Sequence, residues 1–192
     1  SPDEIQKSIQ TKVGKVYNVS QLRQDILIIT DLYAQKGYAY ADANPISKLN
    51  DEDRTVDLSV EIDKGKKVYV GNIDILGNIK TRDNVIRREF RLKEGEVFDG
   101  SKLKRSKQRI NNLNYFEDVK IDTHRGQDPD LIDILTTVTE RPTGAFSVGI
   151  GFSSIENFIF STSITQDNLF GNGHRLGLNA HLSSIRTDFR IN

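Results

Sequence analysis

Apolar residues alternate strictly with small or polar residues over the last fifty positions of the chain. In the first such segment, every second position carries a large apolar side chain: Phe146, Val148, Ile150 and Phe152. Three further segments repeat this pattern, around Phe160, Leu178 and Phe189. A period of two predicts β-strands with one apolar face. Strands of about ten residues with this composition are typical of a membrane β-barrel, and half of a soluble β-sandwich is the alternative.

The first part of the chain has a helical period instead. Leu22, Ile26 and Ile29 share one face of a predicted helix that begins near Asn18 and ends at Gly37. A shorter helix is predicted ahead of it, with Ser1 as its N-cap. Two strands should follow, at residues 38–47 and 55–63. Because apolar and charged residues alternate in the second strand, we expect one face of this sheet to be covered by the helices.

A repeat of about 75 residues relates two stretches of the chain. The motif Gly-x-Val-aromatic, followed by Ser-x-Leu, begins at Gly14 and again at Gly95. The second copy has an additional opening strand, at residues 67–76, so its predicted order is β-α-α-β-β. The first copy has no room for that strand before residue 1. We therefore expect the first copy to lack its first strand.

The predicted fold class is α+β, with two tandem modules at residues 1–65 and 66–141 and antiparallel strands of a transmembrane β-barrel at 142–192. Few charges follow residue 144, namely Glu156, Asp167, Arg175, Arg186, Asp188 and Arg190. The two parts are therefore expected to face different surroundings. Since the chain stops within its fourth alternating segment, we expect these strands not to close a barrel.

The composition excludes several functional classes. Lys and Arg together number 27 and so do Asp and Glu, which leaves no net field to attract nucleic acid. No cysteine is present, so disulfides, zinc thiolate sites and thiol catalysis are excluded. No apolar run is long enough for a transmembrane helix. Any membrane role is therefore expected to depend on strands.

Four stretches resemble one family. Residues 69–78 (Tyr-Val-Gly-Asn-Ile-Asp-Ile-Leu-Gly-Asn), with Thr81 and the run 85–89, resemble the opening of a polypeptide-transport-associated (POTRA) domain of the BamA family. Residues 37–45 resemble the entry to a POTRA second strand, 138–144 the joint to the barrel, and 166–173 the first periplasmic barrel turn. The matches cover nearly the whole chain in the family's order. The resemblance therefore implies that the two modules are the last two POTRA domains and that the alternating segments are the first barrel strands.

The resemblance implies an outer-membrane protein assembly factor. It would bind unfolded outer-membrane proteins by β-strand pairing in the periplasm and support their folding and insertion into the outer membrane. Its implied partners are unfolded outer-membrane proteins, accessory lipoproteins and outer-membrane lipid, and its location is the bacterial outer membrane with the POTRA domains in the periplasm. The alternative is a polypeptide export pore of the same superfamily, of the two-partner secretion type.

Three sets of residues are candidates for binding. A three-stranded POTRA sheet is expected to have two exposed edges that can pair with an extended chain. The candidate residues of one edge are Phe116, Val119, Ile121 and Thr123, with a merely solvated edge as the alternative. In the first barrel strand, which borders the barrel seam in this family, they are Phe146, Val148, Gly149, Ile150, Gly151 and Phe152. Its glycines are expected either to weaken the strand at an opening seam or merely to relieve crowding inside the barrel.

Two basic stretches are candidates for docking a partner. Arg87, Arg88 and Glu89 are predicted to lie on a helix where the resemblance implies docking of accessory lipoproteins. The next helix, at residues 101–113, carries five Lys or Arg residues. These form either a solvated face or a surface for lipid headgroups or an acidic partner.

No catalytic arrangement is visible. His124, His174 and His181 are widely separated and lack partners at metal-ligand spacing. There is no Gly-x-Ser-x-Gly motif and no phosphate-binding loop. We therefore expect no enzymatic activity, no cofactor or metal, no nucleic acid partner and no small-molecule substrate.

Overall fold

The computed structural model describes residues 2–192, so the predicted N-cap Ser1 lies outside the described residues. The described chain divides into two compact units. The first comprises residues up to Asp74 with Arg91–Ser106 and Asp122–Leu135, and the second comprises Ile75–Phe90, Lys107–Ile121 and Thr136–Asn192. The module boundaries expected after residues 65 and 141 follow the sequence repeat rather than this division and stay predictions.

In the first unit, the predicted long helix is present as α2 (Val19–Ala34), preceded by the short helix α1 (Pro2–Ser8). The Asn18 side chain caps α2 by accepting hydrogen bonds from the Ser20 and Gln21 N–H groups. At the other end, Gly37 has a φ of 96°, which a residue with a side chain rarely adopts. Gly37 therefore ends the helix as predicted.

The strands β1 (Asp42–Asn50) and β2 (Thr55–Asp63) pair in antiparallel register, from Asp42 opposite Asp63 to Asn50 opposite Thr55. The strand predicted at residues 38–47 was wrong at both ends. The Tyr38 N–H bonds back to Tyr33, and the Ala41 N–H bonds to the Tyr38 carbonyl, so these residues form a turn. The apolar residues of β2 alternate with exposed ones but are half-buried, and α2 packs against β1.

The second copy of the repeat contains β3 (Tyr69–Leu76), α3 (Asp83–Arg87), α4 (Gly100–Asn112), β4 (Phe116–Arg125) and β5 (Leu131–Glu140). This is the predicted β-α-α-β-β order, and the sheet order is β3-β5-β4. A buried apolar cluster in the second unit joins both helices to the sheet through Val85, Ile86, Ile110, Tyr115, Phe116, Val119 and Val138.

The repeat extends to individual hydrogen bonds. Asn18 and Asp99 stand 81 positions apart, and Asp99 accepts hydrogen bonds from the Ser101 and Lys102 N–H groups just as Asn18 caps α2. Asp25 and Ser106 also correspond and are both buried. Each accepts a hydrogen bond from the loop before its helix: the Gln10 N–H at 2.7 Å in the first copy and the Arg91 N–H at 2.8 Å in the second. One buried acceptor therefore anchors this loop in both modules.

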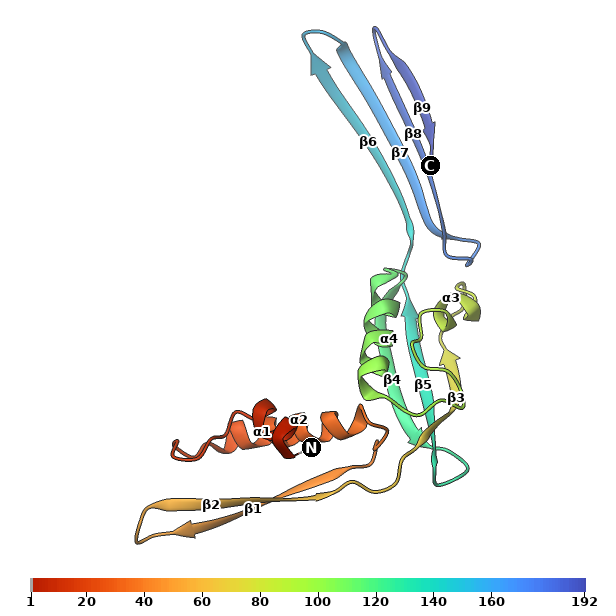
Figure 1. Cartoon of the computed structure of the whole chain (residues 1–192). Coiled ribbons are helices and arrows are strands. Elements are labelled where there is room, and N and C mark those ends of the chain that lie inside the picture. Colours follow the sequence, from red (N-terminus) through yellow and green to blue (C-terminus); the bar gives the residue numbers. More distant parts are fainter. Residues whose placement is uncertain (1) are drawn as a thin grey trace. The chain divides into compact units, whose positions relative to one another are not determined.

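The last four strands form one antiparallel sheet in the order β6-β7-β8-β9 (Figure 1). They are β6 (Gly144–Ser153), β7 (Asn157–Leu169), β8 (His174–Ser183) and β9 (Thr187–Ile191). The turn predicted at 167–173 is shorter than expected, because β7 continues to Leu169 past a bulge after Gln166. Among the described helices, none is long and apolar enough to cross a membrane.

Because Asp25 anchors this loop as a carboxylate, we expect the free energy of unfolding to depend on pH. Burial alone would raise the pKa of Asp25, but the hydrogen bonds from Gln10 and Thr11 outweigh burial and hold this pKa below its ordinary value. A lowered folded-state pKa stabilises the protein at neutral pH, and this contribution is lost as pH falls below about 4. We expect Asp25→Asn to lower the free energy of unfolding at pH 7 by about 1–3 kcal/mol.

Chemical denaturation at several pH values checks this prediction. The difference between wild type and Asp25→Asn should narrow as the pH falls below about 4, because the wild-type carboxylate is then protonated. A difference that stays constant across this range would contradict the assignment. Lys107→Ala, on the exposed side of α4, is a control that should change the stability by less than about 0.5 kcal/mol.

Candidate functional site

The outer edge of β3 is covered by the chain itself. The Val70 N–H donates to the Glu96 carbonyl and the Gly95 N–H to the Val70 carbonyl, both at 2.8 Å, and the Phe98 N–H donates to Val68 at 3.0 Å. The Ile73 N–H is bonded to the Glu94 carboxylate at 3.1 Å. The segment before α4 therefore covers this edge from Val68 to Ile73, so the expectation of two exposed edges was wrong for this part of β3.

The edge at β4 is open. β4 is hydrogen-bonded to β5 on one side, and no other strand of residues 2–192 lies on its second side. Phe116 and Val119 are buried in the apolar cluster, Ile121 is partly buried, and Thr123 is exposed. Three of the four candidate residues of this edge therefore pack against the apolar core, and the fourth, Thr123, is exposed to solvent.

The direction of the free N–H groups follows from the hairpin between β4 and β5. The Gly126 N–H donates to the Leu131 carbonyl at 3.0 Å. Backbone groups of successive residues point to opposite edges of a strand, so residues two apart share one edge. The Tyr115 carbonyl, which accepts from the Arg141 N–H, has the opposite parity, and the burial of both Phe116 and Val119 places the irregularity between these two residues. Counted back from Gly126, the N–H groups of Ile121 and Thr123 are therefore directed to the open edge. They are available to an added strand.

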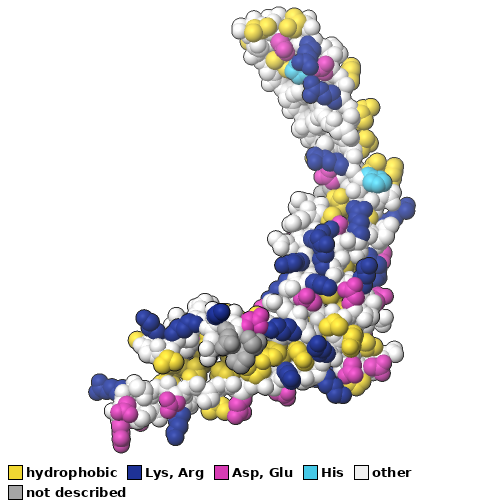
Figure 2. All heavy atoms as spheres, in the orientation of Figure 1, with side chains coloured by type: hydrophobic (Ala, Val, Ile, Leu, Met, Phe, Trp, Pro, Cys, Tyr) yellow, Lys and Arg dark blue, Asp and Glu magenta, His cyan; other side chains and the backbone are white. Residues whose placement is uncertain are grey.

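The sheet β6–β9 has one face that is apolar and exposed. Phe146 and Ile150 are 69% and 72% exposed. Phe146 pairs with Ile164, which pairs with Leu178, so apolar side chains form rows across the strands. Figure 2 shows hydrophobic side chains along this part of the molecule. A continuous exposed apolar face of this kind is suited to lipid rather than water.

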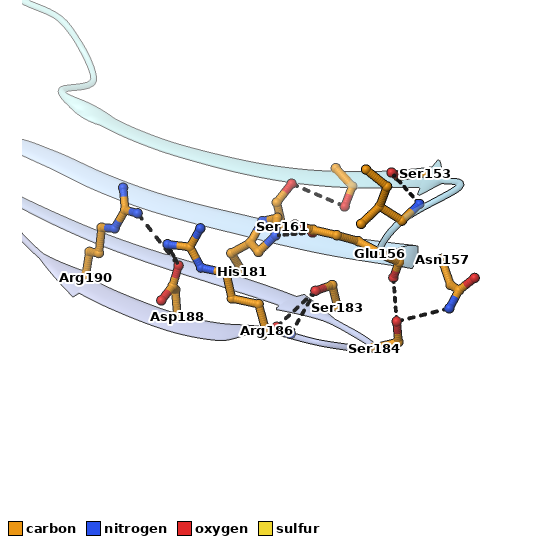
Figure 3. Close-up of polar contacts among 12 residues, drawn as sticks. Ser153, Glu156, Asn157, Ser161, His181, Ser183, Ser184, Arg186, Asp188 and Arg190 are labelled. Carbon is orange, nitrogen blue, oxygen red and sulfur yellow. Dashed lines mark hydrogen bonds and ion pairs between the residues drawn. The ribbon is translucent and has the colours of Figure 1, made fainter.

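The opposite face of the same sheet is polar (Figure 3). A shallow hollow on it is lined by residues that include Ser147, Ser161, Ser163, Asn179, Arg186 and Arg190. Asp188 pairs with both arginines, and His181 lies 3.3 Å from Glu156. The Ser184 hydroxyl donates to the Glu156 carbonyl at 2.8 Å, which ties the β6–β7 loop to the β8–β9 loop. The two faces together have the polarity of a barrel wall.

Two glycines of β6, Gly149 and Gly151, lie on this polar face. A side chain at Gly149 would meet the Ser161 hydroxyl at 2.6 Å, whereas at Gly151 the nearest atom would be 3.9 Å away. Crowding therefore accounts for Gly149 in part and does not account for Gly151. β6 pairs with β7 on one side, and its other edge has no strand beside it within residues 2–192. Whether these glycines assist opening at that edge stays a prediction.

A hydrogen-bonded joint connects the POTRA-like elements of the second unit to the β7–β8 turn. The Asn168 side-chain amide donates to the Thr81 hydroxyl at 2.8 Å, and its oxygen accepts from the Gly173 N–H at 2.8 Å. The Arg82 N–H donates to the Gly171 carbonyl at 3.0 Å. These contacts fix the β7–β8 turn on the loop between β3 and α3.

Glu140 holds the same loop from the sheet side. Its carboxylate accepts hydrogen bonds from the Thr81 N–H at 2.6 Å and from the Lys80 N–H at 2.9 Å. Burial alone would raise the pKa of Glu140, but hydrogen bonds from Thr81 and Lys80 outweigh burial and hold this pKa below its ordinary value. The sequence motifs marked both segments of this joint, whereas the pairing of Thr81 with Asn168 had no signal in the pattern.

The candidate docking residues are arranged differently from the prediction. Arg87 is the last residue of α3 and pairs with Asp83, whereas Arg88 and Glu89 lie in the turn after the helix. After Arg88 the hydrogen bonds change from the helical spacing of four residues to a spacing of three, from the Glu89 N–H to Ile86 and from the Phe90 N–H to Arg87, so the helix gives way to a turn. The Glu89 side chain is mostly buried and pairs with Arg109 at 2.7 Å. The two arginines are therefore the accessible members of this set.

Most of the cationic side chains of the basic helix α4 form ion pairs with acidic residues of the same chain. Lys104 pairs with Asp31 at 2.5 Å, and Lys102 lies 3.7 Å from Glu96. With Arg109 bound to Glu89, three of its five cations have partners in the fold. These contacts favour a structural role for most of this face. No group of three or more metal-ligating side chains occurs in the described part of the chain.

Comparison with known proteins agrees with this architecture. The profile of the POTRA family, described as a surface antigen variable number repeat, matches residues 1–65 and 68–141. The outer membrane protein assembly factor BamA of Neisseria meningitidis is 38% identical over 94% of this chain and 23% of its own length. BamA of Nitratidesulfovibrio vulgaris is 36% identical over 93% of this chain and 22% of its own length. The chain thus spans less than a quarter of these relatives.

The solved structures include a similar fold over nearly the whole chain. The crystal structure of BamA from Haemophilus ducreyi lacking POTRA domains 1–3 superimposes with a TM-score of 0.82 at 30% identity, covering 95% of this chain and 35% of that one. The location of the protein is accordingly the outer membrane, with its POTRA domains in the periplasm. With two POTRA repeats followed by barrel strands, this chain belongs to the POTRA family and, within it, to the BamA group.

Proposed function

We propose that this chain is part of a non-enzymatic outer-membrane protein assembly factor, and that it binds unfolded outer-membrane proteins by strand pairing. The observation that carries the proposal is the difference between the two edges of the last POTRA sheet. One edge is covered by the chain's own backbone at β3, and the other is open at β4. An open edge accepts an extended chain through its backbone and reads little of its sequence. That suits a receptor for many clients.

The barrel strands supply the second part of the proposal. The open edge of β6 has the same unpaired backbone as β4, but it belongs to a sheet with one apolar and one polar face. A client strand that pairs there would have its own apolar side chains directed to lipid. The candidate residues at this edge are those of the predicted set, Phe146, Val148, Gly149, Ile150, Gly151 and Phe152.

Accessory lipoproteins are the proposed partners at the α3 turn. Arg87 and Arg88 are exposed there, whereas Glu89 is held by Arg109. A partner with acidic side chains would therefore meet the two arginines first. Glu89 would then act through the position of Arg109 and Arg88 rather than through direct contact.

Depletion of the full-length protein in its native bacterium tests the function. If the protein is an assembly factor, folded and heat-modifiable porins in the outer membrane should fall together, since many clients depend on it. Unchanged porins with the loss of one secreted polypeptide would instead establish the export pore and contradict the proposal.

Thr123→Pro tests the β4 edge directly. Proline removes the N–H group that points to the open edge, and Thr123 is exposed, so the core is not disturbed. We expect the full-length protein with this change to bind an unfolded outer-membrane protein about two- to tenfold more weakly, which corresponds to one lost hydrogen bond. Binding is measured by titration of a fluorescent client peptide.

Thr123→Val is the matched control, because valine keeps the N–H group and has a high strand propensity. This control should bind the peptide as wild type does. Equal binding by the proline variant and wild type would exclude backbone pairing at this edge.

A further inference from the structure

Two large apolar side chains are almost fully exposed beside the joint. Ile79, in the loop between β3 and α3, is 91% exposed, and Phe170, in the β7–β8 turn, is 82% exposed. Neither belongs to the sheet face that the alternating pattern accounts for. Exposed residues of this size at adjacent positions call for a partner.

The joint holds these two residues close to each other although they are far apart in sequence. Ile79 precedes Lys80, and Phe170 precedes Gly171. A side chain at Gly171 would collide with the Lys80 carbonyl oxygen, so the two segments are in direct backbone contact. The hydrogen bond from the Arg82 N–H to the Gly171 carbonyl fixes them there. Ile79 and Phe170 therefore stand next to the same backbone contact.

The backbone at Phe170 supports a role for its side chain. Its φ is 52°, a left-handed conformation that bulky residues rarely adopt. Burial of the aromatic ring in a core would offset the cost of this backbone conformation, yet the ring of Phe170 is exposed. Strained positions of this kind are concentrated at binding sites.

The charge around the two residues is positive. Lys80 and Arg82 follow Ile79 in the loop and are exposed, and neither forms a salt bridge with a described residue. The nearby acids have partners: Asp83 pairs with Arg87 and Asp167 with Arg175, and Glu140 accepts hydrogen bonds from the backbone of the loop and is also attracted by the Lys80 charge. Apolar side chains beside exposed cations fit a surface that is apolar inside and anionic outside.

We propose that Ile79, Lys80, Arg82 and Phe170 form a docking surface for phospholipids of the periplasmic leaflet, with the cations on the phosphates and the apolar side chains among the acyl chains. Its position favours lipid over a protein partner. The turn that carries Phe170 joins β7 and β8, whose exposed Ile164 and Leu178 belong to the apolar face of the barrel strands. The turn thus lies at one end of two strands that carry that apolar face. This inference does not depend on strand pairing by β4 or β6.

Spin labels in the full-length protein, reconstituted in vesicles of phosphatidylethanolamine and phosphatidylglycerol, test the proposal. Cysteine variants for labelling are Ile79→Cys and Phe170→Cys, with Asp128→Cys as the aqueous control and Ile150→Cys as the lipid control. Labels at 79 and 170 should be relaxed more by oxygen than by a water-soluble nickel chelate, as at position 150. Lys80→Glu combined with Arg82→Glu should shift both labels towards the behaviour of position 128.

Two outcomes would overturn the proposal. Labels at 79 and 170 that behave like position 128 would mean that the surface lies in water. Labels shielded from both reagents would mean that a protein covers it. If a cysteine variant does not fold, photoreactive phospholipid can be cross-linked to the wild-type protein. The peptides containing Ile79 and Phe170 should then carry more lipid than the peptide containing Asp128, and equal labelling would contradict the assignment.

Discussion

Every backbone N–H and C=O group of a β-sheet edge must find a partner in the chain, in water or in another molecule. The two edges of the last POTRA sheet meet this requirement differently. The segment around Gly95 to Phe98 pairs with β3, whereas nothing in the described chain pairs with the outer side of β4. The fold therefore restricts strand addition in this module to one side. β6 presents a second open edge in a sheet with different surroundings.

The joint links the sheet that contains β4 to the sheet that contains β6. Glu140, at the end of β5, binds the loop that contains Thr81, and Thr81 in turn binds Asn168 at the end of β7. The polypeptide continues from β5 into β6 through only the residues 141–143. The covalent link and the hydrogen bonds thus connect the last POTRA sheet to two neighbouring barrel strands. A displacement of the loop between β3 and α3 would therefore also displace the β7–β8 turn.

The sequence predicted those features that depend on local periodicity. The spacing of Leu22, Ile26 and Ile29 identified α2, and the alternation through Phe146 and Ile150 identified β6, because both patterns reflect which side of an element is apolar. Repetition of the Gly-x-Val-aromatic motif identified the two modules. Even the wrong boundary at residues 38–41 has a local cause, since Tyr38 completes the helix end and cannot also begin a strand.

Features that depend on contacts between distant segments were not predicted. Coverage of β3 depends on the path of the loop at Gly95, and periodicity carries no information about that path. The burial of Glu89 depends on Arg109, twenty residues away. Asp25 and Ser106 differ in chemistry, so their shared role as loop anchors became visible only when their partners Gln10 and Arg91 were seen. Of the candidate binding residues, the sequence located the strands correctly, whereas their binding of polypeptide stays a prediction.

Hydrogen exchange of the full-length protein, with and without an unfolded outer-membrane protein, tests the central claim most directly. The account predicts that the client slows exchange at Ile121 and Thr123, whose N–H groups point to the open edge of β4. Val70 in β3 should exchange slowly in both states, because its N–H is already bonded to Glu96. Protection that appears on β3, or no change at Ile121 and Thr123 while the client is bound, would contradict strand pairing at β4.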